Sequence, residues 1–596
     1  MSLSLTLLNG LSGLTASQGG LAVISQNVAN ANTVGYSRQV TTLEQQTIDG
    51  VGLGVQVTGV ERVVDEFLIR ELRSQHSALG EAVARDSFMQ QIQARFGTPQ
   101  GNNTVSAELG RFASALDTLA NNPEDPALRF AVIAAATSLA RNISDLATAT
   151  QTLRGQTDKE ILTSVDVINS QLRIADRLND KIATAMLTGG QTADLKDKRD
   201  LAVAAIAEHV DISTFITPDG RMTIMTGRGQ PLLDADLHQL SYTPVATVNS
   251  TTVFGSLTVS AVDSTTLNPV GVPVTLVSGG QSSAVVSNID SGRLKGLLDV
   301  RDGTLNNLAA QIDTLATAVR DQFNSVHNSG VSFPAPNSLT GTRAVTIADP
   351  FQGTGTVRIA VTDGSGAIVG TPLDLDLTAL GATTVGGLIT AINAGLGADG
   401  TASLVNGLLQ ISATNAGNGI AINETGTQVT GTTRAFSHYF GLNDFFVGSG
   451  STDFAVRPTI VADPRLVATA ELSTTATTGQ TGITIGDNRT IQNLSAVTGT
   501  SVSFSAVGGL LAGSFTLGDY AAAITGLNAA QASDAESRAT IEQDLFDNLD
   551  HRNSSFSGVN VDEEMANMIV FQNAFAASAR MMTTANELFD VLLNMV

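Results

Sequence analysis

Apolar residues recur at seven-residue spacing at both ends of this chain. Four of them form a row near the start, and five form a row that runs to the last residue. The two rows are Leu7, Leu14, Leu21 and Val28, then Met568, Phe575, Met582, Phe589 and Val596. A narrow apolar row is typical of a helix that packs lengthwise against other helices. The pattern predicts two terminal helices that pair and together form an assembly seam.

Longer segments between the ends keep apolar residues three or four positions apart, which predicts helical rods. They are about Val63–Phe96, Leu128–Leu153, Ile161–Met186, Leu305–Val326 and Tyr520–Leu549. The first terminal helix is expected to end near Val28, because asparagines and Gly35 follow it. The stretch Val51–Val60 alternates glycine with β-branched residues and predicts a short extended hairpin arm.

Two regions, 201–287 and about 331–483, are rich in Gly, Thr, Ser and Val and alternate with period two, as in Val357–Asp363. They predict β-rich insertions, the second with one short helix at Val385–Ala394 and room for two sub-domains. The expected fold class is multidomain α+β, with a discontinuous helical frame built from both chain ends as a terminal coiled coil plus long rods.

The expected domain organisation follows from these patterns, since a chain of 596 residues exceeds what one hydrophobic core usually holds. The predicted parts are an N-terminal helix and extended arm (1–60), a helical rod domain (61–200 with 288–330 and 484–558), a β-rich domain (201–287), a β-rich insertion (331–483) and a C-terminal helix (559–596).

The net charge of −23 argues against a surface for nucleic acid or for an anionic membrane, because both need clustered Lys and Arg. The chain has no Cys, which excludes disulfides, thiol catalysis and thiolate metal sites. No apolar run approaches the roughly 20 residues that cross a bilayer, so no membrane insertion is expected. The first basic residue is Arg38, so a cleavable secretory signal is not indicated. Both a cytoplasmic protein and one exported without cleavage fit these facts.

Catalytic and cofactor motifs are not found. The histidines lack metal-ligand spacing and are interpreted as surface or packing residues; they are His76, His209, His238, His327, His438 and His551. The glycines at 52, 54 and 59 follow no dinucleotide-binding pattern, and neither a phosphate loop nor a Gly-x-Ser-x-Gly elbow occurs. No metal, cofactor or catalytic residue is predicted.

The stretch NVANANTVGYSRQ, Asn27 to Gln39, resembles the N-terminal signature of axial proteins of the bacterial flagellum. The axial-motif positions are Asn27, Asn30, Thr33, Gly35 and Tyr36. The ending Ser557–Val596 is similar to that of the flagellar hook-associated protein 1 family, with Phe575 where Tyr is common. Three internal stretches also resemble that family, namely Gly292–Gly330 with its Arg-Asp pair, Leu195–Leu201 and His438–Phe446.

This resemblance implies a non-enzymatic structural subunit at the junction between hook and filament. Such a subunit leaves the cell uncleaved through the flagellar type III export apparatus and resides in the extracellular flagellum. It self-associates in the flagellar axis, where the terminal helices form the inner tube and the β-rich insertions face outward. The partners implied are the hook protein, the second hook-filament junction protein and a dedicated export chaperone.

An adaptable apolar strip on the last helix is predicted to bind the export chaperone, to fill the assembled core, or to do each in turn. It comprises Met565, Met568, Phe571, Met581 and Met582. Asp562, Glu563 and Glu564 are expected to complement the start of that helix, with a contact to a neighbouring subunit as the alternative. Tyr36 is expected either to anchor between subunits or to pack locally.

Burying the five apolar residues of the C-terminal row contributes on the order of 10 kcal/mol. The backbone entropy of about 35 residues opposes it at roughly 1–2 kcal/mol each. The ends are therefore expected to gain order on assembly.

Two other function classes stay open from the residues alone. One is a secreted adhesin or immunogenic surface protein that uses the β-rich insertions, and the other is an enzyme carried on region 331–483.

Overall fold

The computed structural model describes residues 3–48, 51–98, 101–263, 266–280 and 288–594. The chain divides into two compact units. Unit 1 comprises Met1–Phe88, Arg154–Gly303 and Ser533–Val596, and unit 2 comprises Met89–Leu153 and Thr304–Ala532. Each unit is assembled from segments far apart in the sequence, and three long helices contribute residues to both.

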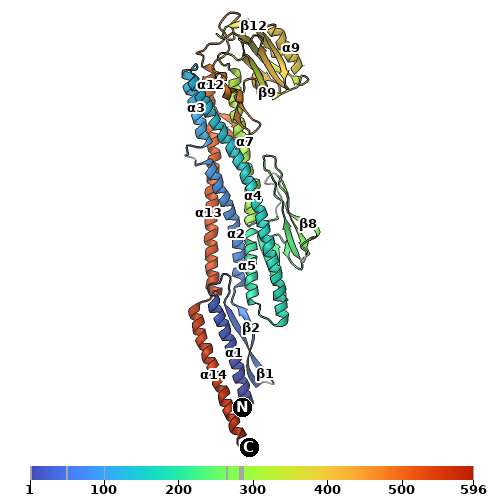
Figure 1. Cartoon of the computed structure of the whole chain (residues 1–596), viewed down its shortest axis with the longest axis vertical. Coiled ribbons are helices and arrows are strands. Elements are labelled where there is room, and N and C mark those ends of the chain that lie inside the picture. The colour runs from blue at the N-terminus through green and yellow to red at the C-terminus, as the bar shows by residue number, and fades with distance from the viewer. Residues whose placement is uncertain (1–2, 49–50, 99–100, 264–265, 281–287, 595–596) are drawn as a thin grey trace. The chain divides into compact units, whose positions relative to one another are not determined.

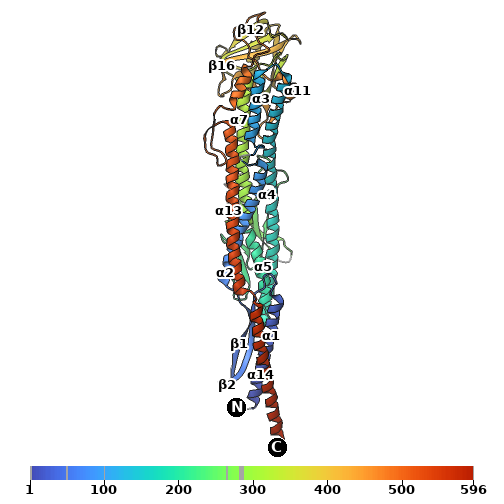
Figure 2. The same ribbon diagram turned by 90° about the vertical axis from the view of Figure 1, so that its left-hand side faces the viewer.

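Both chain ends belong to unit 1. Helices α1 (Leu3–Asn30) and α14 (Val561–Leu593) lie side by side (Figures 1 and 2). Strands β1 (Gln39–Ile48) and β2 (Val51–Arg62) form an antiparallel hairpin along α1. The first helix ends two residues beyond the expected position near Val28. The expected arm at Val51–Val60 supplies only one strand of this hairpin, because the segment after the axial motif supplies the other.

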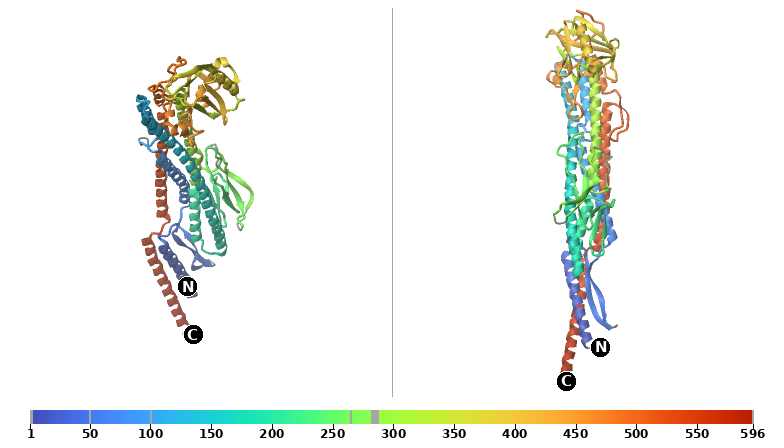
Figure 3. Two further views of the ribbon diagram at one scale, coloured as in Figure 1. Left: turned by 45° about the horizontal axis from the view of Figure 1, so that its top comes forward. Right: turned by 90° about the vertical axis from the view of Figure 1, so that its right-hand side faces the viewer.

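The body of unit 1 combines helices with one antiparallel sheet, which lies beside α4 (Figure 3). The sheet order is β3-β4-β5-β6-β7-β8. Asn169 on α4 joins the two layers, since its amide donates to the Leu240 carbonyl and accepts from the Leu240 N–H, both at 2.9 Å. The helices are α2 (Glu66–Phe96), α4 (Pro126–Thr188), α5 (Ala193–His209), α6 (Arg293–Leu298), the π-helix η1 (Asp299–Thr304) and α13 (Leu517–Ser557). The strands are Ile212–Ile216, Met222–Thr226, Pro231–Leu233, Leu237–Ser241, Leu257–Val262 and Pro269–Val277.

A buried arginine fixes the π-helix to this body. The Arg301 guanidinium lies 2.8 Å from Asp158 Oδ1 and 2.7 Å from Asp302 Oδ2, and its carbon lies 4.2 Å from the centre of the Phe254 ring. A buried charge is tolerated only when it is paired and hydrogen-bonded. The Arg-Asp pair that the sequence singled out is thus part of the core of unit 1.

Unit 2 carries two three-stranded sheets, β12-β11-β16 and β14-β15-β9. Helix α9 (Val385–Leu396) buries Leu388 and Ile392 in the same core as Ile359 of β11 and Ile411 of β15. The short helix expected at Val385–Ala394 is confirmed. The strands of the two sheets are β9 (Ser338–Ala344), β11 (Gly353–Thr362), β12 (Ile368–Asp376), β14 (Gly400–Val405), β15 (Leu408–Ala413) and β16 (Gly419–Val429).

The remaining elements of unit 2 are helices and short strand pairs. The helices are α3 (Val105–Asn121), α7 (Leu305–Ser329), α8 (Leu377–Leu380), α10 (Phe436–Phe440), α11 (Pro458–Ala462), η2 (Pro464–Leu466) and α12 (Arg489–Val497). The pairs are β10 (Pro350–Phe351) with β13 (Thr383–Thr384), β17 (Phe446–Val447) with β18 (Ala455–Val456), and β19 (Val502–Phe504) with β20 (Gly513–Phe515).

The end of α7 is bound to the segment that follows α10. Asn324 Oδ1 accepts from the N–H groups of Phe445 and Phe446, each at 2.9 Å. His327 is fully buried, with Nδ1 2.6 Å from the Asn443 carbonyl oxygen, and its Nε2 accepts from the Ala468 N–H at 3.0 Å. Burial lowers the pKa of His327 to about 4. This histidine is a packing residue that stays neutral.

Candidate functional site

Small residues on α1 form its closest contact with α14. A Cβ added at Gly10 would lie 3.0 Å from Met582 Cγ, and one added at Gly20 would lie 2.6 Å from Cδ1 of Phe571. At Gly13 the neighbour is Ser578, whose Oγ would be 2.7 Å away. Small residues let two helix backbones approach closely. The two helices therefore interlock through glycines facing larger side chains.

The apolar rows predicted as the seam flank this contact. All four predicted residues of α1 and the described four of α14 are half-buried in the single chain; they are Leu7, Leu14, Leu21, Val28, Met568, Phe575, Met582 and Phe589. Val596 lies outside the described residues. The buried positions of α1 include Gly10, Gly20 and Ile24. Sequence reasoning missed the glycines, although their recurrence on one helical face was a signal. The assembly role of the rows stays a prediction.

Asn27 is the centre of the axial motif and is fully buried. Its Nδ2 donates to the Gln39 carbonyl at 2.9 Å and to Glu564 Oε2 at 3.0 Å. Its Oδ1 accepts from the Gln39 N–H at 3.0 Å and from the Tyr36 hydroxyl at 2.8 Å. One amide thus fixes the end of α1, the start of β1 and the start of α14.

The other motif residues shape the turn between α1 and β1. The Thr33 N–H donates to the Asn30 carbonyl at 2.8 Å, and the Thr33 hydroxyl donates to Asn30 Oδ1 at 3.2 Å. Gly35 has φ +77°, and a Cβ there would be 2.6 Å from the Leu201 side chain of α5, so both backbone conformation and space require glycine. Burial, with the nearby Asp197, raises the pKa of Tyr36 to about 12. Within the single chain Tyr36 therefore packs locally as a neutral donor.

Arg38 joins the motif to α14 through two carboxylates. Its Nε lies 2.8 Å from Glu564 Oε1, and its Nη2 lies 2.8 Å from Glu563 Oε1. The side chain of Glu564 is 2% exposed and that of Glu563 is 55% exposed. Although partial burial opposes it, Glu564 with Glu563 raises the pKa of Arg38. Asp562, Glu563 and Glu564 lie in the first turn of α14, as expected, while Asn560 caps the helix and the Glu564 carboxylate also binds Asn27 and Arg38.

A second polar cluster ties the motif to α5. Asp197 Oδ2 accepts from the Ser37 N–H at 3.1 Å, and its Oδ1 lies 2.8 Å from Nη1 of Arg62. Asp200 pairs with both Arg62 and Arg73 at 2.8 Å. The segment Leu195–Leu201, which the sequence analysis singled out, therefore anchors the turn and the end of the hairpin.

A cavity of about 730 Å³ lies beside this turn. Its wall consists of the motif turn, one face of α2, one face of α5 and the end of α13. Leu72 and Phe546 are among its apolar lining residues, and Glu208 and Asp550 are among its acidic ones.

The predicted chaperone-binding strip is divided by the packing of α14. Met565 and Met581 are exposed, at 46% and 45%. The other three residues, Met568, Phe571 and Met582, are half-buried. A partner that covered all five residues would have to bind α14 when it is separated from α1.

Further apolar side chains of α14 are exposed in the single chain. They are Ile569, Val570, Leu588, Val591, Leu592 and Leu593, each between 51% and 71% exposed. Exposed apolar patches mark interaction sites, and Leu588, Val591, Leu592 and Leu593 lie within two turns of one another.

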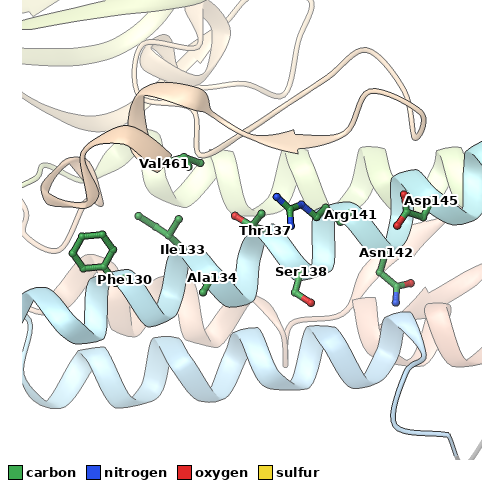
Figure 4. Close-up of a pocket in the computed structure, with 9 residues that line it drawn as sticks. All are labelled: Phe130, Ile133, Ala134, Thr137, Ser138, Arg141, Asn142, Asp145 and Val461. Carbon is green, nitrogen blue, oxygen red and sulfur yellow. The ribbon is translucent and has the colours of Figure 1, made fainter.

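Unit 2 has a separate groove of about 580 Å³ along α4 (Figure 4). Phe130 and Ile133 line one end, Arg141 and Asp145 line the other, and Val461 of α11 faces them. Over the described part of the chain, neither a membrane-spanning helix nor a cluster of three candidate metal ligands is found.

Three family models match this chain. The model for the flagellar hook-associated protein FlgK helical domain matches residues 89–341. The model for the C-terminal part of flagellar basal body rod FlgEFG proteins matches 553–595, and that for the flagella basal body rod protein matches 7–36. The last two cover all of α14 and most of α1, the two helices that pair in unit 1.

Similar proteins share nearly the whole length. Flagellar hook-associated protein 1 of Escherichia coli is 29% identical over 601 residues, covering 98% of each chain. The protein of the same name from Salmonella typhimurium is 27% identical, covering 98% of this chain and 99% of its own. A solved structure, the flagellar hook junction protein FlgK from Burkholderia pseudomallei, aligns with TM-score 0.51 and 16% identity. It covers 82% of this chain and is itself fully covered, so it shares the fold.

Proposed function

We propose that this chain, which is similar to flagellar hook-associated protein 1 over nearly its whole length, is a structural component of the flagellum and forms the junction between hook and filament. In this proposal it polymerises in the flagellar axis through α1 and α14, and it does no catalysis. Its partners are the hook protein, the second junction protein and further copies of itself. It reaches the extracellular flagellum through the type III apparatus, uncleaved and escorted by an export chaperone.

The observation that carries this proposal is the exposed apolar surface of α14. Val570, Val591 and Leu592 are 63%, 56% and 54% exposed, whereas Ser578 and Ala585 of the same helix are buried. Leaving such side chains in water forgoes about 25 cal/mol for each Å² that could be buried. Neighbouring subunits would cover this surface, and the half-buried apolar rows with it.

Order in the terminal helices is proposed to come from assembly. In the single chain the predicted seam residues are only half-buried, so their burial does not fully offset the backbone entropy of two long helices. Amide hydrogen exchange on the purified monomer tests this, with residues 3–40 and 561–594 compared with residues 161–186 of α4. Fast exchange at the ends with slow exchange in α4 is expected. Equal protection would contradict folding on assembly.

Assembly itself is tested by adding the chain to purified hook polymer and measuring the bound fraction by sedimentation. Leu588→Asp and Val591→Asp place charges on the exposed apolar surface and are expected to weaken binding roughly tenfold or more. Asn586→Asp, at an exposed polar position about 160° around the helix from Leu588, is the matched control. Unchanged binding of both apolar variants would refute the role of this surface.

A further inference from the structure

The cavity beside the axial-motif turn holds carboxylates that are not paired with a cation. Glu208 and Asp550 are exposed, and neither forms an ion pair or a side-chain hydrogen bond within the described residues. Leu72 and Leu201 supply apolar wall, and the ring of Phe546 packs on His76 at 4.6 Å. The cavity therefore offers an apolar surface with negative charge at its edge. A fitting occupant combines an aromatic ring with a cation.

The same unit presents such a pair on its surface. Phe67 is 78% exposed, and the Arg70 guanidinium carbon lies 5.5 Å from its ring centre. Of the exposed phenylalanines of unit 1 in the described ranges, which also include Phe215 and Phe556, only Phe67 has an arginine over its ring. Arg70 forms no ion pair with any described residue. Aromatic and arginine side chains are the residue types that dominate protein interfaces.

The cavity and this pair lie on different sides of α2. Ile69, Leu72, Arg73 and His76 of α2 line the cavity. At 100° per residue, Phe67 falls on the opposite face of the helix, with Arg70 on its flank. A head-to-tail contact requires complementary surfaces on different sides of one subunit. Helix α2 meets that requirement.

We propose that Phe67 and Arg70 of one subunit insert into the cavity of a second copy of this chain, with Arg70 facing Glu208 and Asp550. This inference rests on the proposed function in that it assumes a polymer of identical subunits. The contact is heterologous and adds to the contacts of the terminal helices. A cavity of about 730 Å³ is within the usual range of binding sites, about 300–1,000 Å³.

The absence of cysteine from the chain permits a clean cross-linking test. The variant Arg70→Cys/Asp550→Cys is assembled on hook polymer, oxidised and examined on a non-reducing gel. A ladder of covalent dimers, trimers and larger species is expected, because each subunit offers one cysteine to each neighbour. Arg70→Cys/Asp544→Cys, with the second cysteine at an exposed position of α13 that does not line the cavity, is expected to give no ladder.

A charge exchange tests the same contact by binding. Arg70→Glu is expected to raise the concentration for half-maximal assembly roughly tenfold, and Arg70→Glu/Asp550→Arg is expected to restore most of it. Arg177→Glu, which changes an exposed arginine of α4 away from the cavity, is the control. If the wild type assembles but the double-cysteine variant gives no ladder and the charge variants assemble like the wild type, this inference is overturned and the proposed function still stands. A wild-type chain that does not assemble would overturn both.

Discussion

The buried His327 predicts a measurable loss of stability in mild acid. Its ring is fully buried, donates through Nδ1–H to the Asn443 carbonyl and accepts through Nε2 from the Ala468 N–H. Only the neutral ring can do both. Burial, with a smaller effect from Arg457, lowers its pKa from 6.5 to about 4, even though the bond to Asn443 acts in the opposite direction.

The sign and size follow from proton linkage. Between pH 6.5 and about 4 the unfolded chain binds a proton at this histidine and the folded chain does not, so stability falls as pH falls. At 1.36 kcal/mol per pKa unit, the full loss of unfolding free energy from His327 is about 3 kcal/mol. Above pH 6.5 the contribution is constant.

The assay compares urea unfolding of the wild type and of His327→Gln from pH 7.5 to pH 4, followed by circular dichroism and by hydrogen exchange at the end of α7. The Gln side-chain amide has an acceptor oxygen and a donor NH2 group, and it does not titrate. The wild type is expected to lose about 3 kcal/mol relative to the variant across this range. Parallel pH profiles for the two proteins would refute the assigned burial and neutrality of His327.

Three further changes test the junction of the chain ends and the core of unit 1. Glu564→Gln removes a buried charge that binds Asn27 and Arg38, and it is expected to lower the free energy of unfolding by about 2 kcal/mol. Glu563→Gln changes the exposed partner of the same arginine and is expected to lower stability by under about 1 kcal/mol. Amide hydrogen exchange at residues 27–39 measures both effects. Equal effects would contradict the burial of Glu564 and the exposure of Glu563. The methyl group added by Gly20→Ala would press against Phe571, whereas the one added by Gly526→Ala meets no atom within 4 Å. The change in unfolding free energy is therefore expected to be about 1–3 kcal/mol less favourable for Gly20→Ala. Local hydrogen exchange in α1 and α13 measures the difference, and equal stabilisation would exclude the close helix contact. Arg301→Lys keeps the charge but loses the planar guanidinium that binds both Asp158 and Asp302. A drop of about 3 kcal/mol in the unfolding free energy is therefore expected. An unchanged midpoint of urea unfolding would refute the role of the pair.

Local sequence patterns were sufficient for the long helical rods, but α3 and α5 were not predicted. The rods predicted from three- to four-residue spacing are present as α2, α4, α7 and α13, because a helical face is a property of consecutive residues. The two rods predicted at Leu128–Leu153 and Ile161–Met186 form one continuous helix of 63 residues. The expected domain boundaries and the assembly roles of the site residues remain predictions.

The contacts between distant segments could not be predicted from those patterns. Glu564 is one of three acidic residues at a helix start, and nothing local distinguishes it from Glu563; it is buried because Asn27 and Arg38 reach it across more than 500 residues of sequence. The glycines of α1 were visible, but their partners on α14 were not.

The sequence by itself determined the long helical rods, the resemblance to flagellar axial proteins and the two patterned ends, because periodicity and motifs are encoded in neighbouring residues. Tertiary structure alone decided which charges are buried, which glycines are contacts and where a cavity lies beside the axial-motif turn. These depend on the distances between side chains that only the folded chain brings together, and the free energy of a charge or a methyl group is set by those distances.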